Sequence, residues 1–404
     1  CLVPGDWHTM KILVANLGST SLKWRLFAFE GAQFSLLHKG GLERVSDYPA
    51  GINECLGQLK QAGAIQDESE LSAVGFKTVL AQTVTGCVEL NEAVLKDMEG
   101  GNLIAPAHNP PYLTGIRLFA ERMPKTPLVG LFETAFYQWV PDTAKRYGVP
   151  DSWYQSGVRR WGFHGASHKF IAERSAELLG REDIAHRARQ LYVDQGNSTI
   201  GGGDCRVISC HLGGSSSVTG IRNGVAIGNS MGLSPQSGLP HNNRVGDLDA
   251  MAIPFMMQKK GLTLDHVIRD LCHEGGLKGV SGGHNDLRDV QAQSDQGNQD
   301  AQLAIDFLVA ETRRWIGSYY LELNGIDALV FTAGIGENQP MMRKAVCAQL
   351  GNLGVCLDPF ENEECQATEA VISHEESPVK VMVIPTNEEL VVAREVKRFL
   401  EKNS

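Results

Sequence analysis

A short pattern occurs twice in the chain, and it constrains the fold more than any other feature. Residues 16–23 read Asn-Leu-Gly-Ser-Thr-Ser-Leu-Lys, and residues 211–218 read His-Leu-Gly-Gly-Ser-Ser-Ser-Val. Each copy follows an apolar, β-rich run, so the pattern predicts a hairpin of two strands joined by a glycine and hydroxyl turn. Backbone N–H groups and hydroxyls at such a tip suit phosphate oxygens. Two copies favour a duplicated fold that binds a nucleotide, and two unrelated Gly/Ser turns are the alternative.

Composition excludes several classes of protein. The 404 residues are enough for two or three domains. The net charge is −10, from 37 basic and 47 acidic side chains. This argues against binding of nucleic acid, which requires a broadly cationic protein surface, but it is compatible with a local cationic pocket. No apolar run is long enough to span a bilayer, and the nine cysteines include no C-x-x-C pair. We therefore expect a cytoplasmic protein with reduced thiols and neither nucleic acid nor membrane as a partner. Residues 1–9 are expected to be an added or disordered extension before Met10.

Strand-like and helical segments are mixed along the chain, which predicts α/β layers. Strands are expected at 11–17, 22–29, 73–80, 127–132, 206–211, 216–221, 224–228, 327–333 and 379–385, and helices near 51–62, 113–123, 165–180, 248–260, 264–273, 299–324 and 388–402. The polar stretch 181–204, which ends in three glycines, is expected to be a surface loop. Before the last helix, Thr386 and Glu389 match a T-x-x-E capping box.

Residues 334–338, Gly-Ile-Gly-Glu-Asn, directly follow the apolar run 328–331. Two glycines at a strand end let a ligand approach the backbone, and small-molecule sites in α/β folds lie at such ends. A tight strand-to-helix turn is the structural alternative. The common nucleotide motifs G-x-x-x-x-G-K-[ST] and G-x-G-x-x-G are both absent. Residues 279–283 match G-x-S-x-G but lack a preceding strand, which favours a glycine-rich loop over a nucleophile elbow.

Two further positions are candidates for phosphate binding. Arg244 follows a nearly uncharged loop rich in turn residues, where an arginine either clamps a phosphate or faces solvent. His164 and His168 have the i, i+4 spacing of metal ligands on a helix. Gly165 and the absence of a third nearby ligand weaken a metal site, so a histidine that caps a helix start or faces a phosphate there is favoured.

Taken together, these motifs resemble the acetate kinase and propionate kinase family, the acetokinases, within the superfamily of actin, hexokinase and the sugar kinases. The landmarks follow the family order at 16–23, 105–110, 134–136, 162–168, 211–213, 230–232, 244–247, 286–288, 331–338 and 385–390. The resemblance implies an α/β fold of two duplicated actin-like (ribonuclease H-like) domains with a nucleotide cleft between them. We expect the first domain at 10–155 plus 385–404 and the second at 156–384.

The resemblance also implies an activity and its residues. A phosphoryl group would pass in line and reversibly between ATP and a small carboxylate such as acetate or propionate, giving an acyl phosphate and ADP, in a homodimer. Asn16 and Glu388 would hold Mg²⁺ or Mn²⁺, and Lys77 would bind the acceptor. Catalytic roles would fall to Glu133, His164 and Arg244. The nucleotide would contact Lys23, His211, Leu212, Gly213, Gly214, Ser215, Asp286, Leu287, Arg288, Gly334, Ile335, Gly336, Glu337 and Asn338. A kinase for a different acceptor, or a weakly catalytic nucleotide-binding sensor or scaffold, are the alternatives.

The sequence departs from the family pattern mainly on the acceptor side. Glu133 stands where the family has aspartate, and Lys77 where it has arginine. Lys77 keeps the positive charge but lacks the planar guanidinium of arginine, which binds two oxygens at once. The shorter reach of Lys77 and the longer side chain of Glu133 either compensate each other or indicate a different acceptor. Phe76 and Leu80 replace two histidines, which predicts a less polar acyl pocket. The turn at 211–215 lacks the asparagine of the family.

Overall fold

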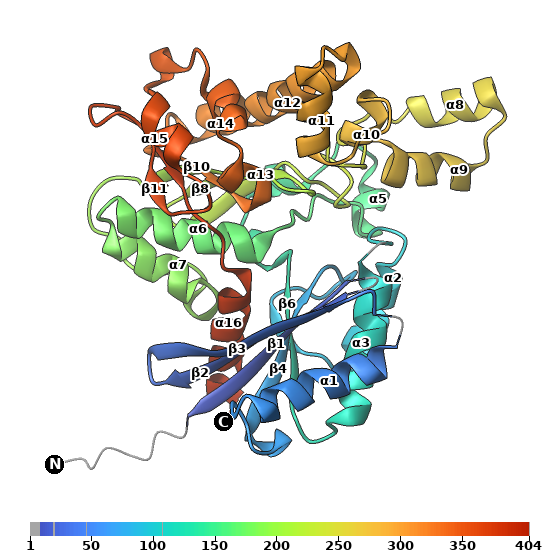
Figure 1. Cartoon of the computed structure of the whole chain (residues 1–404), viewed down its shortest axis with the longest axis vertical. Helices are drawn as coiled ribbons and strands as arrows, with labels where there is room; N and C mark the ends of the chain where they lie inside the picture. The colour runs from blue at the N-terminus through green and yellow to red at the C-terminus, as the bar shows by residue number, and fades with distance from the viewer. Residues whose placement is uncertain (1–8, 19–20, 46, 107, 404) are drawn as a thin grey trace. The chain divides into compact units, whose positions relative to one another are not determined.

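The computed structural model describes residues 9–18, 21–45, 47–106 and 108–403, so most of the expected extension at 1–9 lies outside the described residues. The chain divides into two compact units, Cys1–Gln138 with Asn387–Ser404, and Trp139–Thr386. The boundaries therefore fall at 138/139 and 386/387, where the sequence suggested 155/156 and 384/385. The last helix belongs to the first unit, where it packs against the sheet formed by the first strands (Figure 1).

The first unit is built on a six-stranded sheet in the order β3-β2-β1-β4-β6-β5. Strands β1, β4 and β6 are parallel, and the other pairings are antiparallel. The strands are β1 (Met10–Leu17), β2 (Ser21–Glu30), β3 (Gln33–Glu43), β4 (Leu71–Thr78), β5 (Cys87–Glu89) and β6 (Leu128–Phe132). The helices are α1 (Tyr48–Gln61), α2 (Glu92–Gly100), α3 (Asn109–Arg122) and α16 (Glu388–Asn403), with 3₁₀ turns at Glu68–Glu70 and Ala135–Tyr137.

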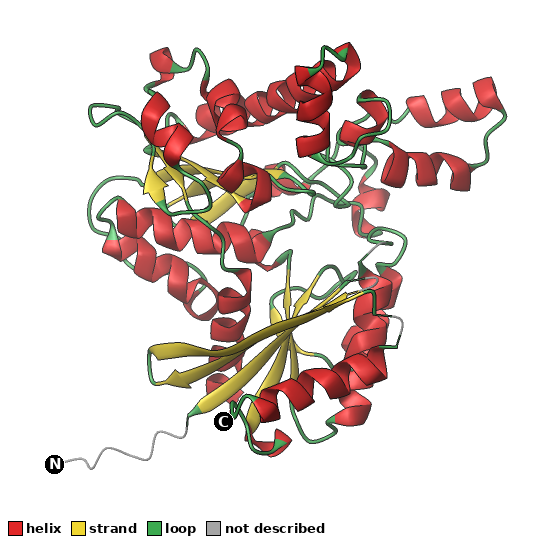
Figure 2. Ribbon diagram, in the orientation of Figure 1, coloured by secondary structure: helices red, strands yellow, loops and turns green. Residues whose placement is uncertain are grey.

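The second unit repeats this topology. Its sheet has the order β9-β8-β7-β10-β12-β11, with β7, β10 and β12 parallel and the remaining pairings antiparallel. Figure 2 shows the strands of both units in yellow and the helices in red. The strands are β7 (Arg206–His211), β8 (Ser217–Arg222), β9 (Val225–Asn229), β10 (Ala328–Thr332), β11 (Ala370–Val371) and β12 (Lys380–Val383). The two copies of the sequence pattern lie at the β1–β2 and β7–β8 turns, which are equivalent positions. The predicted duplicated α/β fold is therefore confirmed.

The remaining helices of the chain belong to the second unit. They are α4 (Asp142–Lys145), α5 (Asp151–Gln155), α6 (Gly165–Leu178), α7 (Glu182–Asp194), α8 (Ala252–Lys260), α9 (Leu264–Arg269), α10 (Gly276–Val280), α11 (Leu287–Asp295), α12 (Gln299–Leu323), α13 (Ala333–Asn338), α14 (Pro340–Cys347) and α15 (Pro359–Glu364), with a π-helical turn at Asp270–Glu274 and a 3₁₀ turn at Gly351–Leu353. Within the described part of the chain, no helix combines the length and the apolar character needed to cross a bilayer.

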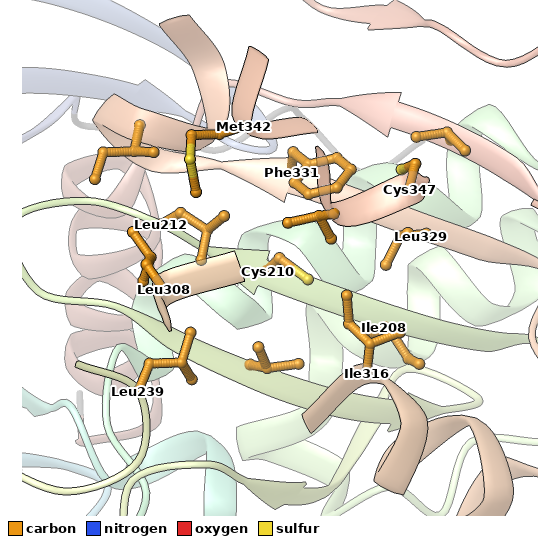
Figure 3. Packing of buried hydrophobic residues seen from close by; sticks show 14 of the residues in the cluster. Ile208, Cys210, Leu212, Leu239, Leu308, Ile316, Leu329, Phe331, Met342 and Cys347 are labelled. Atoms are coloured by element: carbon orange, nitrogen blue, oxygen red, sulfur yellow. The ribbon is translucent and has the colours of Figure 1, made fainter. Parts of the chain in front are cut away.

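The core of the second unit explains why its central strands are almost entirely apolar. All five residues of β10 are buried, as expected for a parallel strand covered on both faces. Figure 3 shows Ile208 and Cys210 of β7 beside Leu329 and Phe331 of β10, and Leu308 and Ile316 belong to the facing helix α12. Leu212 lies in the same core, so the turn after β7 is anchored by its own apolar side chain.

Two local predictions are wrong. The stretch 181–204 was predicted to be a surface loop, but residues 182–194 form helix α7. Ile184, Ala188 and Leu191, at i, i+4 and i+7, make a narrow buried stripe in this otherwise polar segment. The predicted capping box at Thr386 does not form either. Asn387 Oδ1 instead accepts a 3.3 Å hydrogen bond from the backbone N–H of Leu390, and Thr386 Oγ1 has no hydrogen-bond partner among the described residues.

The contact between β4 and α16 gives a test of the packing in the first unit. A Cβ atom on Gly75 would lie 3.0 Å from Cγ2 of Val396 and 3.1 Å from Cγ1 of Val392. We expect Gly75→Val to lower the free energy of unfolding by about 1–3 kcal/mol, because the added methyl groups overpack this contact. Urea denaturation followed by circular dichroism measures the change.

Gly57→Ala is the matched control. Gly57 is exposed in the middle of α1, and a Cβ there meets no atom within 4 Å. We expect this variant to be more stable than the parent by about 0.5–1 kcal/mol, because alanine is the better helix former. An equally stable Gly75→Val protein would contradict the tight packing of β4 against α16.

Candidate functional site

Polar side chains gather where the parallel strands of the first unit end. Asn16 lies near the end of β1, Lys77 near the end of β4, and Glu133 directly after β6. Lys77 Nζ lies 3.1 Å from Glu133 Oε1 and also pairs with the carboxylate of Glu388, the first residue of α16. We call Lys77, Glu133 and Glu388 the lysine–carboxylate cluster. The carboxyl ends of parallel strands are the usual position of ligand sites in α/β folds.

The lysine–carboxylate cluster is largely shielded from water. The side chains of Lys77, Glu133 and Glu388 are 22%, 6% and 13% exposed. Burial alone would lower the pKa of Lys77, but the two carboxylates raise it well above its usual value. Lys77 is therefore charged at every physiological pH, and the cluster carries a net charge of about −1 when both acids are ionised.

Asn16 is oriented by a buried tyrosine. The hydroxyl of Tyr112 donates a 2.6 Å hydrogen bond to Asn16 Oδ1. Burial raises the pKa of Tyr112, and Lys77 acts in the opposite direction, which places the phenol within electrostatic reach of the lysine–carboxylate cluster. The tyrosine stays protonated and keeps donating, so the Asn16 oxygen is held beside the cluster.

A network of histidines and serines occupies the start of α6 and the end of β7 in the second unit. The rings of His164 and His211 stack with their centroids 4.0 Å apart. Hydrogen bonds of 2.8 Å join His164 Nδ1 to Ser217 Oγ, and His211 Nδ1 to Ser167 Oγ. His164 has a left-handed backbone with φ of 60°, an uncommon conformation for a non-glycine residue and one that clusters at functional sites.

His168 supports this network from inside the protein. Its two ring nitrogens each lie 2.8 Å from a serine hydroxyl, of Ser209 and of Ser217. Burial and the neighbouring His211 lower the pKa of His168 well below its usual value, so the ring is neutral. Because Ser217 also contacts His164, His168 positions the histidine that the sequence predicted to be catalytic.

Arg244 is a half-buried cation. Its Nη1 donates a 2.9 Å hydrogen bond to the carbonyl of Pro235, and no carboxylate of the described residues pairs with it. Burial lowers the pKa of Arg244 to about 10, which still leaves the guanidinium charged at neutral pH. A desolvated positive charge with no acidic neighbour favours the binding of an anion.

A pocket of about 450 Å³ opens beside the turn after β7. It is lined by Gly213, Gly214, Asn242, Asp286, Leu287, Arg288, Gly334, Ile335, Asn338 and Gln339. The backbone N–H groups of Ile335 and Gly336 both donate to the carbonyl of Leu212, at 2.8 and 3.0 Å, which fixes α13 against the turn. A Cβ on Gly334 would meet no atom within 4 Å, so the backbone of this glycine is uncovered by protein atoms where it lines the pocket. The 334–338 segment is thus both a strand-to-helix turn and a pocket wall.

Most of the predicted nucleotide-binding residues of the second unit line this pocket, and some have other positions. Leu212 belongs to the core, and His211 to the histidine network. Ser215 and Gly336 do not line the pocket. Glu337 Oε1 accepts hydrogen bonds from the backbone N–H groups of Ala333 (2.7 Å) and Thr386 (3.2 Å), so this acid fixes the chain. Lys23 lies in the first unit, in an exposed ion pair with Glu43.

Asn242 and Gln339 are pocket residues that the sequence analysis missed. Gln339 is the residue next to the predicted segment 334–338, so a wider window would have found it. Asn242 comes from the loop that leads to Arg244, and its approach to the β7 turn depends on a tertiary contact: its backbone N–H donates to the carbonyl of Gly214 at 3.1 Å.

Two acceptor-side expectations meet different outcomes. Lys77 and Glu133 are in direct contact, as a compensating pair would be. Phe76 and Leu80 are fully buried, and Phe76 packs edge-on against Phe119 with the ring centroids 5.5 Å apart. Both belong to the core of the first unit, and the less polar acyl pocket stays a prediction.

The repeated sheets define a two-domain α/β protein of the actin-like type, with a glycine-walled pocket in one unit and a lysine–carboxylate cluster in the other. The chain belongs to the acetokinase family, whose model matches residues 38–394. It is 37% identical to an acetate kinase of Geobacillus kaustophilus (strain HTA426) over 411 residues, which cover 96% of this chain and 99% of that protein. An acetate kinase of Bacillus subtilis (strain 168) is 36% identical, with the same coverage.

Solved structures agree with this assignment. The chain superposes on an acetate kinase of Porphyromonas gingivalis with a TM-score of 0.83 and 32% identity, covering 97% of this chain and 100% of that one. For a propionate kinase of Francisella tularensis the TM-score is 0.79 and the identity 30%, with coverage of 96% and 98%. The resemblance inferred from the motifs is confirmed.

The lysine–carboxylate cluster predicts a pH-dependent stability. In Lys77→Met, two shielded carboxylates would remain without their cation, and we expect the free energy of unfolding at pH 7 to fall by about 3–5 kcal/mol. The pKa values of both acids should rise in the folded variant, so its deficit should shrink as the pH falls towards 4, where the acids are protonated. On the alkaline side, the contribution of Lys77 in the parent is lost when the pH rises through its raised pKa.

Lys23→Met is the matched control, because the Lys23–Glu43 pair is 61% and 68% exposed. We expect a loss of less than about 1 kcal/mol for this variant, with little dependence on pH. Urea titrations of the three proteins between pH 4 and 8 make the comparison. Equal losses at Lys77 and Lys23 would show that the lysine–carboxylate cluster is not shielded as described.

Proposed function

We propose that this chain is an ATP-dependent phosphotransferase that phosphorylates a small carboxylate, such as acetate or propionate, reversibly to an acyl phosphate. The observation that carries the proposal is that one loop of the second unit holds both the pocket residue Asn242 and the half-buried cation Arg244. A phosphate chain needs both a wall of backbone and amide groups and an uncompensated positive charge. The acetate and propionate kinases to which the chain is similar supply the reaction class.

In this proposal the second unit binds ATP and the phosphoryl group in transfer. The phosphates lie against Gly213 and Gly214, and the nucleoside lies towards Asp286 and Arg288. Arg244 and His164 neutralise the charge that spreads over the phosphoryl oxygens, since catalysis of phosphoryl transfer is mostly positioning and charge stabilisation. The support of Ser217 and His168 behind His164 fits a histidine whose ring orientation matters.

The first unit binds the acceptor in this proposal. A carboxylate is already ionised at neutral pH, so it needs no general base to become a nucleophile. We assign Lys77 to the negative charge of the acceptor, and Glu133 to holding Lys77 in place, which the 3.1 Å contact supports. Catalysis by Glu133 is then electrostatic and does not involve proton abstraction.

The donors predicted to hold Mg²⁺ or Mn²⁺ are compatible with such an ion. Among the described residues there is no group of three or more His, Cys, Asp or Glu side chains placed to hold a metal. Asn16 and Glu388 provide one amide oxygen and one carboxylate, which suits a hard cation that keeps water and substrate phosphates as its other ligands. When bound, the ion would neutralise phosphate charge.

We further propose that the protein acts as a homodimer in the cytoplasm. The cysteines of the described residues are all free thiols, as in a reducing compartment. Helix α8 has no buried residue. Met251, which precedes α8, is 70% exposed, and Phe255 within α8 is 61% exposed. Apolar side chains left uncovered on a helix with no buried face support an interface with a second copy.

A hydroxamate trap tests the reaction. With ATP, Mg²⁺, hydroxylamine and a panel of small carboxylates, we expect acyl hydroxamate from at least one acid. We expect Arg244→Ala to lower kcat/KM by about 10²–10³-fold, the effect of removing one preorganised charge donor.

Arg314→Ala is the matched control for Arg244→Ala. Arg314 is 71% exposed on α12, and its replacement should leave turnover unchanged. Tight ATP binding without hydroxamate from any acid would contradict the proposal, and it would favour a nucleotide-binding protein with another role.

A further inference from the structure

The side chain of Asn242 lies against the turn after β7. A Cβ atom built on Gly214 would be 3.4 Å from Asn242 Nδ2 and 3.8 Å from its Cγ. Asn242 therefore occupies the space in front of Gly214 that a side chain at position 214 would use. Both residues line the pocket of about 450 Å³.

The amide of Asn242 has no hydrogen-bond partner within the described residues. Its Oδ1 is buried without a partner, and no hydrogen bond of its Nδ2 to another described residue occurs. Buried polar groups in native proteins are nearly always satisfied, so the acceptor Oδ1 calls for a donor such as a water, and the unused donor Nδ2 is the atom that can bind an anion. An amide placed in a pocket wall and unused by its own chain has the properties of a ligand-binding group.

The backbone around Asn242 is held on both sides. Its N–H donates to Gly214, and its carbonyl accepts from Lys278 N–H at 2.9 Å. The preceding residue, His241, accepts a 2.9 Å hydrogen bond at Nδ1 from the backbone N–H of Ser216. The amide is therefore presented by a fixed loop, and binding it costs little ordering of the protein.

The chemistry at this end of the pocket suits a phosphate group. The backbone N–H group of Gly214 makes no backbone hydrogen bond among the described residues, so it is a further donor beside Asn242 Nδ2. At another part of the wall, hydrogen bonds from Arg288 lower the pKa of Asp286 to about 2, and the two side chains form a 2.6 Å ion pair, so the positive charge of Arg288 is already matched there. The phosphates are favoured beside Gly214.

We propose that Asn242 binds the phosphate chain of the nucleotide by donating a hydrogen bond from Nδ2 to a phosphate oxygen. This inference rests on the proposed function, because it takes ATP or ADP as the ligand. Arg244 follows two residues later on the same loop, so a contact at Asn242 also fixes the position of the cation assigned to the phosphoryl group.

Isothermal titration calorimetry with ADP and with adenosine tests this inference on the full chain. We expect Asn242→Ala to raise the Kd for ADP by about 10- to 100-fold, the effect of losing one hydrogen bond to a charged group, and to leave the Kd for adenosine unchanged. The matched control is Asn243→Ala, whose side chain does not line the pocket and whose ADP affinity should equal that of the parent.

A rescue experiment separates a direct contact from damage to the loop. Gly214→Asn in the Asn242→Ala background projects an amide from the other side of the same space, and it should restore most of the ADP affinity. Thermal melts that match the parent show that each variant is folded.

The outcomes discriminate between the two proposals. An unchanged Kd for ADP in Asn242→Ala would overturn the inference while leaving the proposed function intact. Equal weakening of ADP and adenosine would also overturn it, because the contact would not be to phosphate. A folded parent protein that binds no nucleotide would overturn the proposed function and this inference together.

Discussion

The structure depends on one constraint, the burial of parallel strands on both faces. The central strands β4 and β10 can carry almost only apolar side chains along their length, as the fully buried β10 illustrates. Polar groups are then tolerated where the strands end, and there they collect: Asn16, Lys77 and Glu133 at one sheet, and His211 with the neighbouring turn at the other. The chemistry of both units is a consequence of where their hydrophobic strands stop.

Duplication gave the two units the same strand order but opposite electrostatic characters. In the first unit one lysine is shared by two carboxylates, so the cluster keeps a negative charge, which is compatible with the metal cation and the acceptor proposed above. In the second unit Arg244 is half-buried without a carboxylate partner among the described residues, and the charge at this position is positive. A charge that is shielded from water interacts strongly with a charged ligand bound next to it. This asymmetry therefore supports the proposal that the first unit binds the metal and the acceptor and the second unit binds the nucleotide.

Much of this organisation could be predicted from the sequence, because strong local patterns carry it. The twin turns predict the duplication, and the apolar runs before them predict β1 and β7. Strand β3 was missed because, at the edge of its sheet, it carries no buried residue and so has no hydrophobic alternation. Helix α7 was missed because its apolar stripe is narrow. Asn242 is a pocket residue only through a tertiary contact, which no local pattern encodes.

Two charged side chains, Arg343 and Glu337, hold the pocket wall through hydrogen bonds to the backbone. Arg343 is fully buried, and its guanidinium donates to the carbonyls of Gly336 and Glu337, and to Asn362 and Cys365, at 2.7–3.0 Å. Glu337 meanwhile accepts backbone N–H groups on the other side of the same turn. A six-residue helix such as α13 cannot satisfy its own terminal backbone groups. Arg343 and Glu337 satisfy these backbone groups. The segment that carries the pocket glycines is thereby fixed, although a glycine has no side chain that could pack.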